Sequence, residues 1–116
     1  MSRMHHEALE AAAAVERQGL DEDAHLAALG RHLAALSPAV TLTLARGSSD
    51  HAASYLAYLV MARLGCVVAS LPLSLLTLGQ APLRTAGALA VAVSQSGQSP
   101  DVVEPMRALR ASGACT

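Results

Sequence analysis

Three short apolar segments alternate with segments of helical periodicity along most of the chain. The apolar segments, residues 39–44, 66–70 and 87–93, are rich in Val, Leu and Ala and are bounded by proline or glycine, which is typical of buried strands. Residues 50–64 and 100–113 instead place apolar side chains at steps of three and four and end at a glycine, so both predict helices. This alternation predicts an α/β fold, with an open parallel sheet between two helical layers.

The first 37 residues have a different pattern and predict two helices without a strand. Residues 2–18 have a strong helix-forming composition and end at Gly19, which we interpret as a stop. From residue 21 a leucine stripe at helical spacing continues to Ser37-Pro38, and we interpret it as a core or dimer contact. We therefore expect an N-terminal helical segment over residues 1–37 and the α/β domain over residues 38–116.

The segment between the second and third strands and the end of the chain carry weaker patterns. Residues 71–86 contain two prolines and a glycine, which favours a loop with one helical turn. Pro105 lies inside the last predicted helix, where it removes a hydrogen bond at a cost of about 3 kcal/mol. Residues 114–116 resemble the opening of a further strand, so we expect a sheet of three to four strands that is part of a longer fold.

Composition and charge exclude several classes of function. A chain of 116 residues holds one domain at most, and a net charge of −1 gives no basic field for nucleic acid. The chain has no lysine, which excludes a Schiff-base lysine and a Walker-type phosphate loop. No apolar run reaches the ~18 residues of a membrane span, so we expect no membrane partner and a cytoplasmic location. The histidines and cysteines lack the spacing of a closed metal site, and no residue calls for a cofactor.

Two turns rich in hydroxyl groups follow the first and third predicted strands. After residues 87–93 come Ser94, Gln95, Ser96 and Ser99, and after residues 39–44 come Ser48 and Ser49. Ligands of an open parallel sheet bind beyond the carboxyl ends of its strands, and a helix start offers unpaired N–H groups to an anion. A helix cap would explain either turn alone equally well, but two such turns on strands that can be neighbours favour one shared phosphate pocket.

The other polar residues of the first turn leave alternatives open. His51 is a candidate for proton transfer or a partly exposed packing residue, because an imidazole titrates near neutrality. Asp50 caps or positions the turn. Arg46 either approaches an anionic ligand or faces solvent. No catalytic residue is assigned from the sequence.

The two turns, ARGSSDHAA and AVSQSGQSPD, resemble the signature turns of the sugar isomerase (SIS) domain. They are most similar to the isomerase half of glutamine–fructose-6-phosphate aminotransferases and to amino-sugar phosphate deaminase-like proteins. The resemblance implies a flavodoxin-like domain and a role in sugar-phosphate binding for Ser48, Ser49, Ser94, Gln95, Ser96 and Ser99. It implies aldose–ketose isomerisation of a hexose or amino-sugar 6-phosphate in a complete family member. Separately, the leucine stripe and the exposed edge of a short sheet make a homo-oligomer the expected assembly.

The chain also departs from these relatives. It begins Met1-Ser2-Arg3 and lacks the N-terminal catalytic cysteine of a glutaminase domain, so use of glutamine is not expected. The catalytic Glu, His and Lys of the family come from a second SIS domain, which this sequence does not contain. We therefore expect these residues to bind the phosphate group of a sugar phosphate without catalysing its isomerisation. The alternatives are a non-catalytic sugar-phosphate sensing module of a regulator and a structural remnant without a ligand.

Overall fold

The computed structural model describes residues 2–116, except for the side chains of residues 20–22, and the chain divides into two compact units. Residues Met1–Ser37 form the first unit and Pro38–Thr116 the second. The first is a single helix, α1 (Arg3–Leu36). The second contains β1 (Val40–Ala45), α2 (Ser48–Leu64), β2 (Val67–Ser70), α3 (Leu73–Thr77), β3 (Leu89–Val93) and α4 (Pro100–Ala111).

The second unit is built on a three-stranded parallel sheet with the order β2-β1-β3. The chain leaves β1 for β2 on one side and returns to β3 on the other, so the winding reverses between β1 and β3. Cys115 extends the sheet beyond β3 through a parallel bridge to Leu89, with a 2.7 Å bond from the Ala90 amide to the Cys115 carbonyl. These findings confirm the predicted α/β fold with three strands and the start of a fourth.

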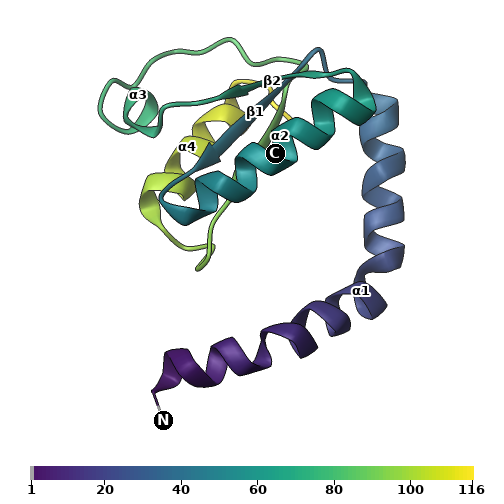
Figure 1. Cartoon of the computed structure of the whole chain (residues 1–116). Helices are drawn as coiled ribbons and strands as arrows, with labels where there is room; N and C mark the ends of the chain where they lie inside the picture. The colour runs from purple at the N-terminus through teal and green to yellow at the C-terminus, as the bar shows by residue number, and fades with distance from the viewer. Residues whose placement is uncertain (1) are drawn as a thin grey trace. The chain divides into compact units, whose positions relative to one another are not determined.

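Helices cover both faces of this sheet, as Figure 1 shows, with α2 in front of the strands and α4 behind them. The side chains of β1 alternate between the two layers. Leu42 and Leu44 belong to the main core, together with Ala88 and Ala90 of the β3 segment and Leu109 of α4. Thr41 and Thr43 point to the other face and are also buried. Thr41 Oγ1 lies 3.3 Å from Cys66 Sγ, which satisfies its hydroxyl in an otherwise apolar layer.

The N-terminal unit corrects one prediction, because α1 runs through Gly19 as one helix where two were expected. A glycine inside a helix costs about 1 kcal/mol relative to alanine, and strong helix formers outweigh that cost on both sides of Gly19. A real stop appears at Ser37, which adopts a left-handed conformation (φ 44°) and bonds back to the Leu33 carbonyl. Leu26 and Leu29 of the leucine stripe are more than half exposed.

Elsewhere the predicted elements hold to within two or three residues. The helical turn expected in residues 71–86 is α3, and Val102 and Leu109 lie on the buried face of α4. Pro105 lies inside α4 and is fully buried, so its ring fills the core at the position where the helix lacks an amide donor.

Candidate functional site

The two hydroxyl-rich turns lie side by side at the carboxyl edge of the sheet. β1 and β3 are hydrogen-bonded neighbours, and their register pairs Ala45 with Val93, the last residue of each strand. Arg46 and Ser94 therefore leave the sheet at the same level. This is the point where the winding reverses, which is where open α/β sheets bind their ligands. We call residues 46–49 and 94–101 together the cradle.

The turn after β3 is held by its own serines. The Gly97 amide donates to Ser94 Oγ and the Gln98 amide donates to Ser96 Oγ, each at 3.2 Å. Gly97 has φ +65°, a left-handed conformation that glycine adopts without steric cost. A serine hydroxyl that accepts from an amide keeps its own proton for donation. The O–H groups of Ser94 and Ser96 are therefore available to donate to an acceptor on a ligand.

The start of α4 contributes a further backbone donor. Ser99 is the N-cap residue and Pro100 follows it as the first residue of α4, but the Ser99 side chain makes no capping bond. The amides of Val102 and Val103 both donate to the Ser99 carbonyl, at 3.0 and 2.9 Å. Among the hydrogen bonds of residues 2–116, none occupies the Asp101 amide. The loop uses the Gly97 and Gln98 amides for its own bonds. The donors left at this turn include the Asp101 N–H, the serine hydroxyls and the Gln95 and Ser96 amides, for which the hydrogen bonds of residues 2–116 show no acceptor.

The turn after β1 opens directly into α2. Gly47 is the N-cap residue with φ 58° and ψ −133°, a backbone conformation that non-glycine residues avoid. Ser48 and Ser49 form the first turn of α2, so their amides have no partner within the helix. The helix dipole adds partial positive charge at this end. Two helix starts therefore point at the same edge of the sheet.

Arg46 joins the two halves of the cradle through an ion pair between its Nη1 and Asp101 Oδ2. The arginine comes from the turn after β1 and the aspartate from the first turn of α4. The sequence indicated that Arg46 either approaches a ligand or faces solvent, and it did not indicate this pair. Only the β1–β3 register brings the two residues together.

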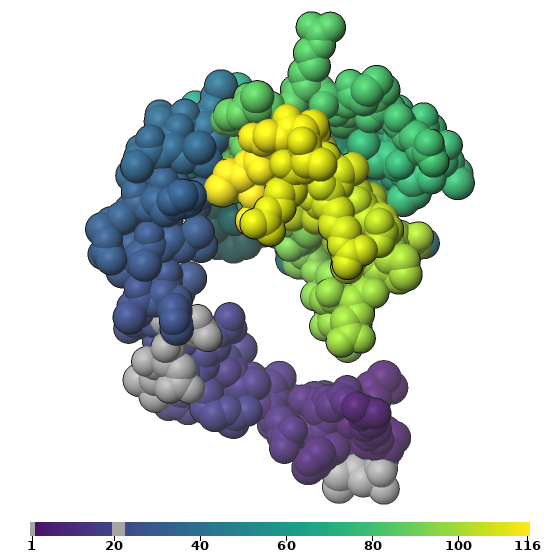
Figure 2. Space-filling view, turned by 180° about the vertical axis from the view of Figure 1, so that it is seen from behind, coloured from purple at the N-terminus to yellow at the C-terminus, as the bar shows by residue number. Residues whose placement is uncertain are grey.

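The remaining predicted residues lie at the surface of the cradle. Ser48, Gln95 and Ser96 are exposed, and Ser49, Ser94 and Ser99 are half-buried. Asp50 and His51 are exposed in the first turns of α2. The structure thus brings all six predicted binding residues to one edge of the sheet. In Figure 2 the yellow-green segment that carries the turn after β3 projects from the surface on the side shown.

A groove of about 380 Å³ adjoins the cradle. Ser94 and Gly97 line it at one end, and Ala92, Val102, Val103 and Met106 give it an apolar wall. Arg107 and Arg110 also line it, and Arg107 is paired with Glu104 at 2.7 Å. Arg110, in the last turn of α4, is therefore the arginine of this groove that the ion pairs of the described residues leave unneutralised.

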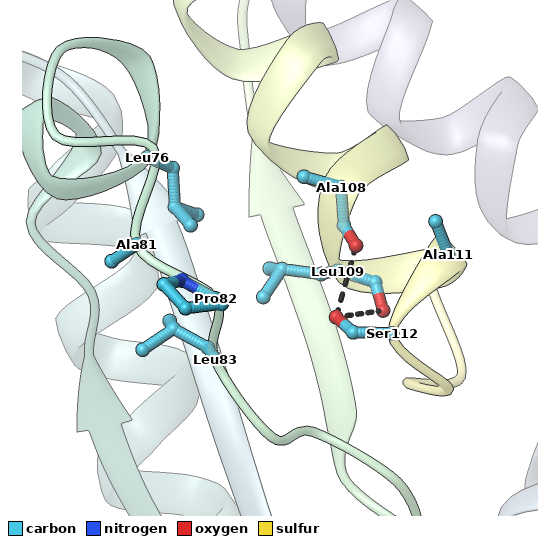
Figure 3. Close-up of a pocket in the computed structure, with 8 residues that line it drawn as sticks. All are labelled: Leu76, Ala81, Pro82, Leu83, Ala108, Leu109, Ala111 and Ser112. Carbon is cyan, nitrogen blue, oxygen red and sulfur yellow. Dashed lines mark hydrogen bonds between the residues drawn. The ribbon is translucent and has the colours of Figure 1, made fainter.

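A second groove, of about 410 Å³, lies at the other end of α4 (Figure 3). Leu76, Pro82 and Leu83 face Leu109 and Ser112 across it, and Ser112 Oγ donates to the carbonyls of Ala108 and Leu109. No charged side chain lines this groove, and its one hydroxyl is engaged within α4. It lacks the donors that a phosphate needs.

The described residues contain neither a metal-binding cluster nor a membrane-spanning helix. No group of three or more His, Cys, Asp or Glu residues lies close enough together to hold a metal ion. No helix within the described part of the chain combines the length and apolar character needed to cross a membrane.

Comparison with solved structures finds a similar protein. The chain aligns over 98% of its length, at 40% identity and with a TM-score of 0.89, with the crystal structure of a "putative phosphosugar isomerase" from Silicibacter pomeroyi. It spans 35% of the length of that protein. No protein-family model matches the chain. No curated protein matches it either.

Proposed function

We propose that the cradle binds the phosphate group of a sugar phosphate, a hexose or amino-sugar 6-phosphate. The observation that carries the proposal is the placement of two hydroxyl-rich helix starts on adjacent strand ends, at the reversal of the sheet. The 40% identity to a protein named as a phosphosugar isomerase supports the same substrate class.

The donors of the cradle are sufficient for a phosphate monoester. The hydroxyls of Ser94, Ser96 and Ser99 lie on one turn, and those of Ser48 and Ser49 on the other. A hydrogen bond to an ionised acceptor contributes about 1.5–3 kcal/mol, so the five hydroxyls together contribute roughly 7.5–15 kcal/mol, against an entropic cost of association of about 4–15 kcal/mol. Gln95 adds an amide donor for the phosphate or for a sugar hydroxyl.

The resemblance of the two turns to the signature turns of the SIS domain supports a more specific assignment. We propose that the chain is the phosphate-binding part of a SIS-type domain, of the isomerising aminotransferase or amino-sugar phosphate deaminase type. In a complete protein the bound phosphate would position the sugar carbons for aldose–ketose isomerisation, because binding energy at a remote group orients the reacting atoms. Asp50 and His51 directly follow Ser49, and both side chains are titratable and exposed. We expect these 116 residues to bind substrate without measurable turnover.

Calorimetric titration tests this function. Fructose 6-phosphate and glucosamine 6-phosphate are titrated into the chain, with unphosphorylated fructose as the matched control. We expect saturable binding of at least one phosphate ester and none of fructose. Flat isotherms for every phosphorylated sugar tested would support the structural-remnant alternative and end the proposal. Binding without turnover in an otherwise complete protein would instead favour the sensing module.

We further propose that the chain self-associates through the outer face of α2. Tyr55, Tyr58, Met61 and Leu64 are each between 47% and 71% exposed on this helix. Aromatic and methionine side chains in such a patch are typical of interfaces. Sedimentation velocity at several concentrations checks the assembly, with Tyr58→Glu expected to shift the species toward monomer. A monomer at all concentrations would refute this part.

A further inference from the structure

We propose that Arg46 selects a doubly charged phosphate ester in the cradle and that Asp101 is the positioning residue that orients it. This inference rests on the proposed sugar-phosphate binding and assigns charge selectivity to one ion pair. It starts from the contact between Arg46 Nη1 and Asp101 Oδ2, which joins the turn after β1 to the first turn of α4.

Asp101 is a fixed partner for the arginine. It follows Pro100 in the first turn of α4, where the helix dipole favours a carboxylate. Arg46 by contrast leaves the sheet on a long side chain with many rotamers, and its side chain is 61% exposed. Pairing with Asp101 holds the guanidinium at the first turn of α4, which directly follows Ser99. Such preorganisation lowers the entropy lost when a ligand binds.

The pair also reduces the repulsion between the Asp101 carboxylate and an anionic ligand. A carboxylate at the start of α4 competes with an incoming anion for the same helix terminus, and unpaired it would repel a dianion. Arg46 neutralises that carboxylate. A guanidinium has five N–H donors, so one can remain on Asp101 while others reach the phosphate oxygens. The cradle then offers one cation that is already oriented, next to neutral hydroxyl donors.

The preference for a phosphate ester over a sulfate ester tests this inference, because an ion pair with a purely structural role would not change that preference. Fructose 6-phosphate is a dianion at pH 8, because the second pKa of a phosphate ester is about 6, whereas fructose 6-sulfate is a monoanion of similar shape. Both are titrated into the wild-type chain and into Arg46→Gln. We expect Arg46→Gln to weaken binding of the phosphate about tenfold and binding of the sulfate less, so that the preference for phosphate falls.

Asp101→Asn separates orientation from simple attraction. Removal of a negative charge should by itself tighten binding of an anion. If Asp101 orients Arg46, the variant instead binds fructose 6-phosphate severalfold more weakly, and the double variant binds no more weakly than Arg46→Gln alone. Arg63→Gln is the charge-matched control, because it lies in the last turn of α2, about 22 Å along that helix from Ser48. We expect it to leave both affinities unchanged.

The outcomes distinguish this inference from the function on which it rests. Tighter binding by Asp101→Asn would show that Asp101 competes for the arginine, and an unchanged phosphate preference in Arg46→Gln would show that Arg46 does not select charge. Either result overturns the inference while wild-type binding keeps the proposed function. Absence of wild-type binding to any phosphorylated sugar would overturn both. Equal weakening by Arg63→Gln would reduce the effect to net charge and also overturn the inference.

Discussion

Replacement of Ser96 by alanine tests the part of the cradle on which the proposed function depends. The Ser96 side chain is exposed and accepts one 3.2 Å hydrogen bond from the Gln98 amide. Its own proton is therefore the donor that we assign to the phosphate. Loss of one hydrogen bond to an ionised group costs about 1.5–3 kcal/mol, which corresponds to a roughly 10- to 150-fold weaker affinity. The freed Gln98 amide is exposed to water, so the free energy of unfolding should fall by no more than about 1 kcal/mol.

Titration calorimetry with fructose 6-phosphate measures the affinity, and urea unfolding measures the stability. Ser112→Ala is the matched control, since this serine lies at the opposite end of α4 and donates to the Ala108 carbonyl at 2.9 Å. We expect the reverse pattern for it, with stability lowered by about 1 kcal/mol and affinity unchanged. Ser96→Thr, which keeps the hydroxyl, should retain most of the affinity. Equal affinities of wild type and Ser96→Ala would refute the reasoning, because the site would then lie elsewhere.

Three further substitutions test the fold that positions the cradle. Leu44→Ala removes a fully buried side chain from the centre of the sheet and should lower the free energy of unfolding by about 2–5 kcal/mol in urea; a loss under 1 kcal/mol would contradict the assigned core. Gly47→Ala should cost about 1–3 kcal/mol through backbone strain alone, because no atom lies within 4 Å of the added Cβ, and a neutral effect in the same assay would show that the turn adopts another conformation. Gly19→Ala should stabilise α1 by about 1 kcal/mol, seen as a later loss of the 222 nm circular dichroism signal on heating, whereas a loss of helicity would favour the two separate helices predicted from the sequence.

The sequence was sufficient to predict the strands and the two turns because their signals are local. Apolar runs between glycines and prolines mark the strands, and Ser99-Pro100 marks the start of α4. Gly19 misled the prediction because a lone glycine is both a weak helix stop and a tolerable helix interior residue. The context of strong helix formers decided between the two.

The ion pair of the cradle could not be predicted in the same way. Arg46 and Asp101 belong to different strand–helix units, and only the pairing of Ala45 with Val93 brings them together. The internal bonds of the second turn are a further example. Ser94 and Ser96 accept from Gly97 and Gln98, so these two amides are used within the loop while the serine O–H groups stay available as donors. Long-range register and hydrogen-bond direction are properties of the folded chain.

The most direct test of the account is a titration of the ¹⁵N-labelled chain with fructose 6-phosphate, followed residue by residue in ¹H–¹⁵N correlation spectra. We predict saturable shifts of the backbone amides of residues 46–49, 94–99 and 101, with the Asp101 amide among the largest. Shifts confined to the groove between α3 and α4, at Leu76, Leu83 and Ala111, would contradict the claim that the phosphate binds at the reversal of the sheet.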